Sequence, residues 1–356
     1  MTTQPQEVFL DIIPQSRFDI INIKEKISEL INGVLGYYCK ASYCSYHTTA
    51  GYLEQSICSS FNHQEDKIKS YIKAFQQLFP DNANYQHDDM ALRHELTEEQ
   101  RLVEPKNADS HLTFIGSGLK NCVDYANKPE IPVYFIDLDG VNEFGRRTRR
   151  TSVMLYNKEE QVYEHQVEVP VSKHPIDSIN LRDPRLGYLN KLDELFQAYD
   201  VERGRVDIAL DPAEQYAGIT VNEYETLLMT HDLFQILKNP LKFMAEKGKY
   251  LLQNPRKIPS RTKEYAKYDF VHIFNDLMDS FHISESVIEK MMAKAIALPA
   301  EKFLGVRKKV SFLISNNGKD RTAEILHGRY QSPILVQWKE TPKLSRSVTL
   351  TITKYK

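Results

Sequence analysis

The strongest constraint on the fold of this chain is an internal repeat, because two copies of one unit must build two similar structures. The first copy predicts a strand, a helix, a second strand and an Ala-Gly step, at 7–13, 21–34, 37–46 and 50–51. The same order returns at 161–169, 186–196, 204–211 and 217–218. Each copy also ends on a proline, an apolar strand, a turn, basic residues and an alternating strand, at 132–156 and 333–355. Three matching features in the same order indicate a duplication.

The repeat divides the chain into two expected domains, 1–160 and 161–356. The second copy holds an additional segment at about 240–305, whose apolar spacing predicts amphipathic helices. Within it, Leu237 to Lys267 carries nine Lys or Arg residues against two acids. This basic stretch is either an ordinary solvated face or a docking surface for an acidic partner.

Composition excludes several classes of protein. Of the 356 residues, 41% are hydrophobic and 26% are charged, as in an average globular protein, and the net charge of −2 offers no global attraction to nucleic acid. The first residues lack the basic flank and apolar core of a signal peptide, and no apolar run approaches the roughly 18 residues of a membrane span. The four cysteines form no zinc spacing. We therefore expect a cytoplasmic protein with reduced thiols.

Acid–base residues gather in the first half, at loop–strand junctions. His47 follows the strand at 37–46, His87 and Asp88 lie in YQHDD, and Asp109 and His111 lie in NADSH. Histidines beside carboxylates acquire pKa values suited to general acid or base catalysis. The same side chains hold catalytic metals, so a divalent metal (Mg²⁺ or Zn²⁺) bound by His47, His87 and His111 is an alternative. The third reading is structural, in which each imidazole satisfies buried neighbours.

A second group of charges lies on the strands near 133–150. Asp137 and Asp139 share one face of a strand, and Arg147 and Arg149 share one face of the next, because side chains alternate. The arginines either hold a phosphate of the substrate or form cross-strand ion pairs with the aspartates on a solvent face. Cys44 precedes His47, but with no third partner it is better explained as a small buried hydrophobe.

These motifs resemble the YjbQ-like family, also described as secondary thiamine-phosphate synthases. HTTAG at 47–51 resembles the family's H-T-S-A segment, PDNANYQHD at 80–88 its P-D-N-x-N-Y-x-H-D stretch, and NADSHL at 107–112 its A-D-D-M-P-x-H region. The resemblance spans about residues 7–158. It implies an α+β fold of two similar mixed-sheet domains flanked by helices, the second with the helical insertion.

The second half resembles the family in complementary places. AGITVNE at 217–223 is similar to S-L-T-x-N-E, and GRYQ at 328–331 to G-T-W-Q, whereas the histidine position is filled by Gln215 or Tyr216. The resemblance therefore implies a composite site in which the two halves pack as pseudo-equivalent subunits. Its expected catalytic residues are His47, His87, Asp88, Asp109, His111 and Glu223, and its expected substrate-binding residues are Thr48, Tyr85, Arg147, Arg149 and Gln331. Self-association is implied as well, since family members form trimers.

Three functions follow as expectations. The resemblance implies a transferase that joins a pyrimidine diphosphate to a thiazole phosphate and releases pyrophosphate. The residues alone also fit a metal-dependent hydrolase or transferase acting on another phosphorylated small molecule. The third expectation is a non-enzymatic scaffold that binds a ligand or partner, with the basic segment at about 240–305 as its contact surface.

Overall fold

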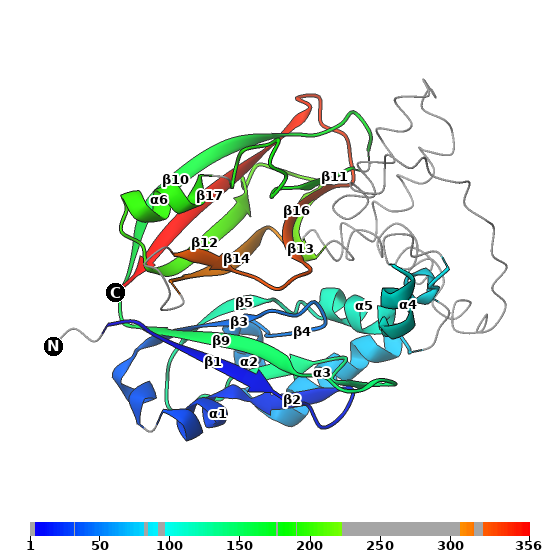
Figure 1. The fold of residues 1–356 in the computed structure, drawn as a ribbon, viewed down its shortest axis with the longest axis vertical. Helices are drawn as coiled ribbons and strands as arrows, with labels where there is room; N and C mark the ends of the chain where they lie inside the picture. Colours follow the sequence, from blue (N-terminus) through cyan, green and yellow to red (C-terminus); the bar gives the residue numbers. More distant parts are fainter. Residues whose placement is uncertain are drawn as a thin grey trace.

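The structure is a computed structural model that describes residues 4–31, 33–81, 85–91, 97–175, 177–189, 191–222, 307–316 and 323–356. Helices and strands follow one another along the chain, and the strands form several antiparallel sheets. The expected α+β fold is therefore confirmed. Two sheet-containing halves lie against each other, the N-terminal half below and the C-terminal half above in Figure 1. Within the described residues, no helix has the length and apolar character needed to cross a membrane.

The first half contains a four-stranded antiparallel sheet with the order β1 (Gln6–Ile12), β9 (Arg149–Tyr156), β3 (Lys40–Ser45) and β5 (Cys122–Ala126). A smaller sheet has the order β2 (Asp19–Asn22), β6 (Tyr134–Asp137) and β4 (Ala50–Gly51). A short hairpin joins β7 (Val141–Asn142) to β8 (Gly145–Arg146). The helical segments are α1 (Ile23–Leu30), η1 (Val34–Tyr37), α2 (Gln55–Ser60), α3 (Glu65–Leu78), η2 (Gln86–Asp88), α4 (Glu98–Val103) and α5 (Ala108–Gly116).

The second half contains a five-stranded antiparallel sheet with the order β10 (Glu159–Pro170), β17 (Ser345–Tyr355), β12 (Arg203–Leu210), β14 (Lys309–Ser315) and β15 (Glu324–Leu326). Its smaller sheet has the order β11 (Asp177–Asn180), β16 (Gln331–Gln337) and β13 (Ala217–Asn222). The helix α6 (Leu192–Ala198) lies between β11 and β12 in the chain.

The two halves share one strand order. In the large sheet of each half, the first strand pairs with the last, the last pairs also with the third, and the third pairs with a later strand. The resulting orders are β1-β9-β3-β5 and β10-β17-β12-β14. The small sheets also correspond, as β2-β6-β4 and β11-β16-β13. The register agrees in detail, because Ala50 pairs with Asp137 in one half and Ala217 pairs with Gln337 in the other. The two Ala-Gly steps therefore occupy the same place in the small sheets.

The shared order also gives the expected insertion a counterpart. In the first half, the connection from β4 to β5 covers residues 52–121 and contains α2 to α5. In the second half, the connection from β13 to β14 covers residues 223–308 and stands at the same point in the order. The segment at about 240–305 itself lies outside the described residues. The helical insertion expected there stays a prediction.

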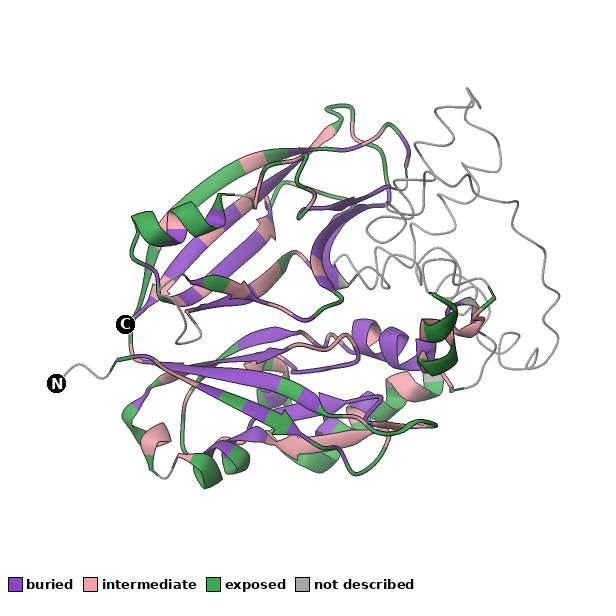
Figure 2. Cartoon of the chain, in the orientation of Figure 1, coloured by how far each residue is buried: buried purple, intermediate pink, exposed green. Residues whose placement is uncertain are grey.

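Most local expectations in the first half are confirmed. The strand expected at 7–13 is β1. The apolar residues from Ile68 to Phe79 recur at helical spacing and predict a helix, which is α3, and Thr97 with Gln100 three residues on predicts a helix cap, which forms as the capping box of α4. The apolar residues at 111–118 predict a strand, which is wrong, because residues 111–116 belong to α5. Eight consecutive residues of α5 are buried, so the helix has no polar face and its sequence shows no helical period (Figure 2).

The two halves meet at a tightly packed seam, where β14 lies against β5 and β3 (Figure 1). The rings of Tyr156 and Tyr355 stack with centroids 3.8 Å apart, and the Tyr355 hydroxyl is 2.8 Å from Ser42 Oγ. Gly328 lies so close to the Tyr46 carbonyl that an added Cβ would be 1.9 Å from that oxygen. The backbone of the second half therefore lies directly against the strand end that carries His47.

Candidate functional site

Four of the expected catalytic residues gather at the start of α5. His87 and His111 are both buried, and their rings lie 5.1 Å apart with a tilt of 55°. His87 Nδ1 is 2.9 Å from Asp88 Oδ1, and the same oxygen accepts the backbone N–H of Ala108 at 3.0 Å. The carboxylate of Asp88 thus links the first turn of α5 to the imidazole of His87. We call His87, Asp88, Asp109 and His111 the α5 cluster.

Asp109 lies in the first turn of α5, and the pKa of its carboxyl is raised. Burial raises the pKa of its carboxyl to about 6, and the neighbouring charges of Asp88 and Asp139 act in the same direction. Arg17 opposes this effect, since its Nη2 lies 2.7 Å from Asp109 Oδ1. A carboxyl with a pKa near neutrality exchanges a proton readily under physiological conditions. Asp109 therefore has the properties of a general acid or base.

Asp139 connects the α5 cluster to the basic strand. Asn107, which directly precedes α5, donates from Nδ2 to Asp139 Oδ2 at 2.8 Å, and Arg147 donates from Nη1 to the same oxygen. The second oxygen, Asp139 Oδ1, is buried without a hydrogen-bond partner, as is Asn107 Oδ1. The backbone of Gly140 holds Arg17 and Arg147 close together. The Gly140 N–H donates to the Arg17 carbonyl, and the backbone N–H of Arg147 donates to the Gly140 carbonyl. Both guanidinium groups thus face the acids at the N-terminus of α5.

Arg149 forms a buried ion pair and not an open phosphate site. Its Nε and Nη2 donate to the two oxygens of Asp137 at 2.7 and 2.8 Å, and Nη2 also reaches Thr49 Oγ1 and the Asp139 carbonyl. The Arg149 and Asp137 side chains are 1% and 0% exposed. The expected cross-strand pair on a solvent face is therefore corrected to a fully buried pair, which joins β9 of the large sheet to β6 of the small sheet. Arg147 differs, since its side chain is 34% exposed and only its Nη1 makes a described side-chain bond.

His47 is held as a neutral imidazole. Burial lowers its pKa to about 3, and the nearby charges of Arg149 and Arg147 act in the same direction. Its Nε2 accepts the backbone N–H of Arg150 at 2.7 Å, so the neutral ring carries its proton on Nδ1. Such a ring can donate a hydrogen bond from Nδ1, but it has no open nitrogen with which to accept a proton. His47 is linked to the α5 cluster through the arginine charges, and no described contact joins it to His87 or His111.

Gln331 reaches His47 from the second half. Its Nε2 donates to the carbonyls of Ser45 and His47 at 2.9 and 3.1 Å, and its Oε1 accepts the N–H of Gly328 at 2.8 Å. Every polar atom of this side chain is therefore used to hold backbone. The expected proximity of Gln331 to His47 is present, but these bonds give Gln331 a positioning role in place of the expected contact with substrate.

The remaining expected residues have different surroundings. Tyr85 is buried, and its hydroxyl donates to the Pro80 carbonyl at 2.8 Å. Thr48 is half-buried beside His47. Cys44 is a buried free thiol among apolar side chains at the seam. Glu223 lies outside the described residues.

The metal site expected at the three histidines stays a prediction. Nε2 of His47 accepts a backbone N–H, which argues against His47 as a ligand, whereas the bond from His87 Nδ1 to Asp88 is the arrangement that metal-binding imidazoles commonly have. Among the residues that the structure describes, no group of three or more His, Cys, Asp or Glu side chains is arranged to hold a metal ion.

Two residues of the site were not expected from the sequence. Arg17 lies in a loop after β1, and no local pattern distinguishes it from other exposed arginines. Asn107 had a usable signal, because Asn is a preferred residue immediately before a helix. The strand-like pattern of residues 111–118 conceals that signal, and the Asn107 side chain bonds Asp139 in place of the helix.

Comparisons with known proteins give distant structural likenesses. No protein-family model matches the chain, and no curated protein matches it. Solved structures similar to it include a YbjQ-like protein of unknown function from Sulfolobus solfataricus P2 (14% identity, 55% of this chain and 99% of that chain, TM-score 0.27). Others are a hypothetical protein from Aeropyrum pernix K1 (13%, 54% and 98%, TM-score 0.27) and an uncharacterized conserved protein of the yjbq/upf0047 family from Clostridium acetobutylicum (13%, 54% and 99%, TM-score 0.24). Likenesses at this level assign neither a family nor an activity to the chain.

Proposed function

We propose that the chain is a duplicated YjbQ-like protein whose first half is an enzyme acting on a phosphorylated small molecule at the α5 cluster. The observation that carries the proposal is the buried carboxyl of Asp109, whose pKa is raised to about 6 beside two adjoining histidines. Perturbed pKa values concentrate at functional sites because catalytic acids and bases must exchange protons near neutral pH. In this proposal Asp109 transfers the proton, and the Asp88–His87 pair and His111 form the polar environment of the Asp109 carboxyl.

The phosphate group is assigned to Arg17 and Arg147. Their side chains are 37% and 34% exposed, and each uses a single terminal nitrogen in its described side-chain bonds. A guanidinium has five N–H donors, so most donors of both residues are open to a ligand. Two such forks suit a phosphoryl group and would neutralise charge that develops on a leaving phosphate or diphosphate.

The duplication is supported by the common strand order and by one repeated pair of residues. Arg149 and Arg346 stand at the same position of β9 and β17, opposite Ile12 and Val169. Arg149 binds Asp137, and Arg346 donates from Nε to Gln337 Oε1 at 3.2 Å, at the position equivalent to Asp137. The second half also has a buried arginine, but its carboxylate partner is Glu214, at 2.8 Å, and not the residue at the position equivalent to Asp137. In this proposal the second half is a structural copy that supports the active first half.

The resemblance to secondary thiamine-phosphate synthases supplies the first reaction to test. Purified protein is incubated with the pyrimidine diphosphate and the thiazole phosphate, and thiamine phosphate and pyrophosphate are measured with and without Mg²⁺. We expect product, and a loss of at least about a hundredfold in rate for Asp109→Asn, in line with removal of a general acid or base. No product under either condition excludes the thiamine reaction.

The wider proposal is tested with a panel of phosphate monoesters and diphosphates. Arg147→Gln should raise KM for every phosphorylated substrate, because it removes a phosphate donor. Arg150→Gln is the matched control, since Arg150 belongs to the same basic stretch but forms an exposed ion pair with Asp11 on the other face. Equal effects of the two substitutions, or no turnover of any panel member by the unaltered protein, would refute a phosphate-specific site.

A further inference from the structure

The loop that carries His47 has a counterpart in the second half. The Ala-Gly steps of the two small sheets occupy the same place. The third residue before each alanine is His47 in the first half and Glu214 in the second. The histidine position of the second half is therefore filled by Glu214, and the assignment of Gln215 or Tyr216 from the sequence is wrong.

The two side chains at this position share one structural task. His47 Nε2 accepts the backbone N–H of Arg150 at 2.7 Å, and Glu214 Oε1 accepts the backbone N–H of Ser347 at 2.9 Å. Arg150 and Ser347 directly follow the two equivalent buried arginines. Each side chain thus fixes the last long strand of its half to the loop before the Ala-Gly step.

The two side chains differ in what remains after this bond. The second oxygen of Glu214 accepts from Arg346 Nη1 at 2.8 Å, so both oxygens are used. Because His47 Nε2 accepts an N–H, the neutral ring carries its proton on Nδ1. The half-buried ring makes no hydrogen bond from Nδ1 to the described residues, and Nδ1 is not enclosed. His47 therefore presents an open donor, whereas Glu214 has no unused oxygen and no proton to donate.

The open donor of His47 lies beside a partly exposed cation. Burial lowers the pKa of the ring, and the charges of Arg149 and Arg147 act in the same direction, so both guanidinium groups lie near the imidazole. Arg149 is enclosed in its ion pair with Asp137, whereas the Arg147 side chain is 34% exposed. An N–H donor next to an open guanidinium suits an anionic oxygen, because both groups donate and neither accepts.

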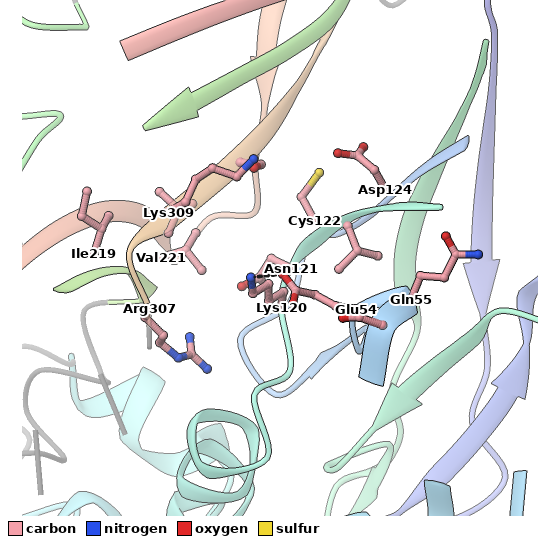
Figure 3. Close-up of a pocket in the computed structure, with 14 residues that line it drawn as sticks. Glu54, Gln55, Lys120, Asn121, Cys122, Asp124, Ile219, Val221, Arg307 and Lys309 are labelled. Carbon is pink, nitrogen blue, oxygen red and sulfur yellow. Dashed lines mark hydrogen bonds and ion pairs between the residues drawn. The ribbon is translucent and has the colours of Figure 1, made fainter. Parts of the chain in front are cut away.

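The backbone of His47 is held from both halves, which fixes the direction of this donor. Asn121 Nδ2 donates to the His47 carbonyl from the first half, and Gln331 Nε2 donates to the same carbonyl from the second half at 3.1 Å. Figure 3 shows Asn121 at the seam, in the wall of a cavity of about 350 Å³ between the halves. A donor that is oriented before the ligand binds needs little reorganisation when it meets a negative charge.

We propose that the Nδ1–H of His47 donates to the phosphoryl group that Arg147 binds, and that Glu214 leaves the second half without an equivalent donor. This inference rests on the proposed phosphate site and adds a residue to it. His47 then binds the substrate as a neutral donor and transfers no proton, in contrast to the acid–base role expected from the sequence. The chain has one such site, in its first half.

Calorimetric titration of the full chain with inorganic phosphate and with diphosphate tests the donor. In His47→Gln, the glutamine Oε1 takes the place of Nε2 as acceptor for the Arg150 N–H, but no donor stands at the position of Nδ1. We expect affinity to fall about tenfold or more, as for the loss of a hydrogen bond to a charged group. His165→Gln is the matched control, since His165 is exposed on β10 of the second half. Unchanged affinity in His47→Gln, equal weakening by His165→Gln, or two equal sites per chain overturns the proposal.

Hydrogen exchange of the Arg150 amide, followed by NMR, separates the donor from the structural bond. His47→Gln should leave the exchange rate near that of the unaltered protein, whereas His47→Ala should raise it about tenfold, because the amide loses its acceptor. If His47→Gln accelerates exchange as much as His47→Ala, the weaker binding reflects a disturbed strand, and the donor assignment is refuted.

Arg147→Gln distinguishes this inference from the proposed function on which it rests. Weaker phosphate binding in Arg147→Gln with unchanged binding in His47→Gln refutes the role of His47 alone. Unchanged binding in Arg147→Gln, or no binding of either probe by the unaltered protein, refutes the phosphate site itself and the role of His47 with it.

Discussion

Individual residues in this protein owe their chemistry to what surrounds them more than to their type. His47 and His111 are both histidines of the first half. Yet His47 is fixed as a neutral ring beside two arginines, while His111 lies against another imidazole in the α5 cluster. Asp137 is the last residue of β6 and Asp139 lies beyond the strand, so the expected shared strand face does not form. Both oxygens of Asp137 accept from Arg149, whereas Asp139 Oδ1 has no hydrogen-bond partner among the described residues. The predictions at this scale concern protonation.

The imidazole of His47 should remain neutral, with its proton on Nδ1, across the whole physiological range. Nitrogen NMR of ¹⁵N-histidine-labelled protein should show no titration of His47 between pH 5 and 8. Because its pKa falls from 6.5 to about 3 on folding, the unfolded chain binds a proton that the folded chain does not. His47 therefore makes the protein less stable as pH falls from 6.5 toward 3. His47→Gln should remove that part of the acid sensitivity, and a midpoint near 6.5 for His47 would contradict the prediction.

The carboxyl of Asp109 should titrate at about pH 6, well above its ordinary value of 3.8. Since the folded state keeps the proton longer than the unfolded state, this group favours folding most below pH 3.8, and the contribution is lost as pH rises through 6. Carbon NMR of ¹³C-aspartate-labelled protein gives the midpoint directly. Arg17→Gln should move the midpoint higher, because Arg17 stabilises the charged form. An unchanged midpoint in that variant would contradict the assigned ion pair.

At the scale of elements, the two halves use one pattern with different local chemistry. Both place a buried arginine on their last long strand, facing the end of the central strand of the small sheet. In the first half the partner is Asp137 on β6, and in the second it is Glu214 on the loop before β13. The strand order tolerates this exchange because it depends on backbone pairing, whereas each arginine requires only one carboxylate.

Removing the buried arginine of the first half should be costly. Arg149→Met leaves Asp137 buried and unpaired, and we expect a loss of about 3–5 kcal/mol in the free energy of unfolding, measured by urea denaturation. The double variant Asp137→Leu, Arg149→Met should recover most of that loss, because no uncompensated charge remains. A single variant within about 1 kcal/mol of the unaltered protein would be inconsistent with the fully buried pair.

The contact of Gly328 with Tyr46 should tolerate no side chain. Gly328→Ala places a Cβ against backbone, so we expect destabilisation of about 1–3 kcal/mol and a shift of the seam. Gly36→Ala is the control, because no atom lies within 4 Å of the added Cβ. Thermal denaturation of both variants measures the difference, and equal midpoints would show that the seam is looser than this contact requires.

At the scale of the whole molecule, the seam joins the halves into one cooperative unit. Besides the Tyr156–Tyr355 stack, Arg307 of the second half donates to the Phe114 and Leu119 carbonyls at the end of α5, at 3.3 and 3.1 Å. Arg205 of β12 pairs with Asp124 of β5. These polar and aromatic contacts would be lost if one half unfolded alone.

We therefore expect a single unfolding transition. Trp338 is the only tryptophan and is buried in the second half, so its fluorescence follows that half, whereas far-ultraviolet circular dichroism follows both. The two signals should give the same midpoint in urea, because coincident transitions indicate two-state behaviour. Separate midpoints would show that the halves unfold independently.

The amino-acid sequence was sufficient to predict the α+β class, the order of elements that recurs in both halves, and the elements with clear periodicity, since strand alternation, the spacing of α3 and the cap of α4 are local properties. It also predicted Arg147 and the aspartates and histidines of the α5 cluster, but not Arg17. Which of these side chains are open to a ligand depends on how the whole chain packs. Arg147 lies just before β9 and Arg149 is its first residue, so the shared strand face expected for them does not form. The Arg147 side chain is partly exposed, whereas the Arg149 side chain is fully buried. Burial and partners depend on residues distant in the chain, as Arg17 is from Asp109 and Gln331 is from His47, and the local pattern around one residue carries no information about such contacts.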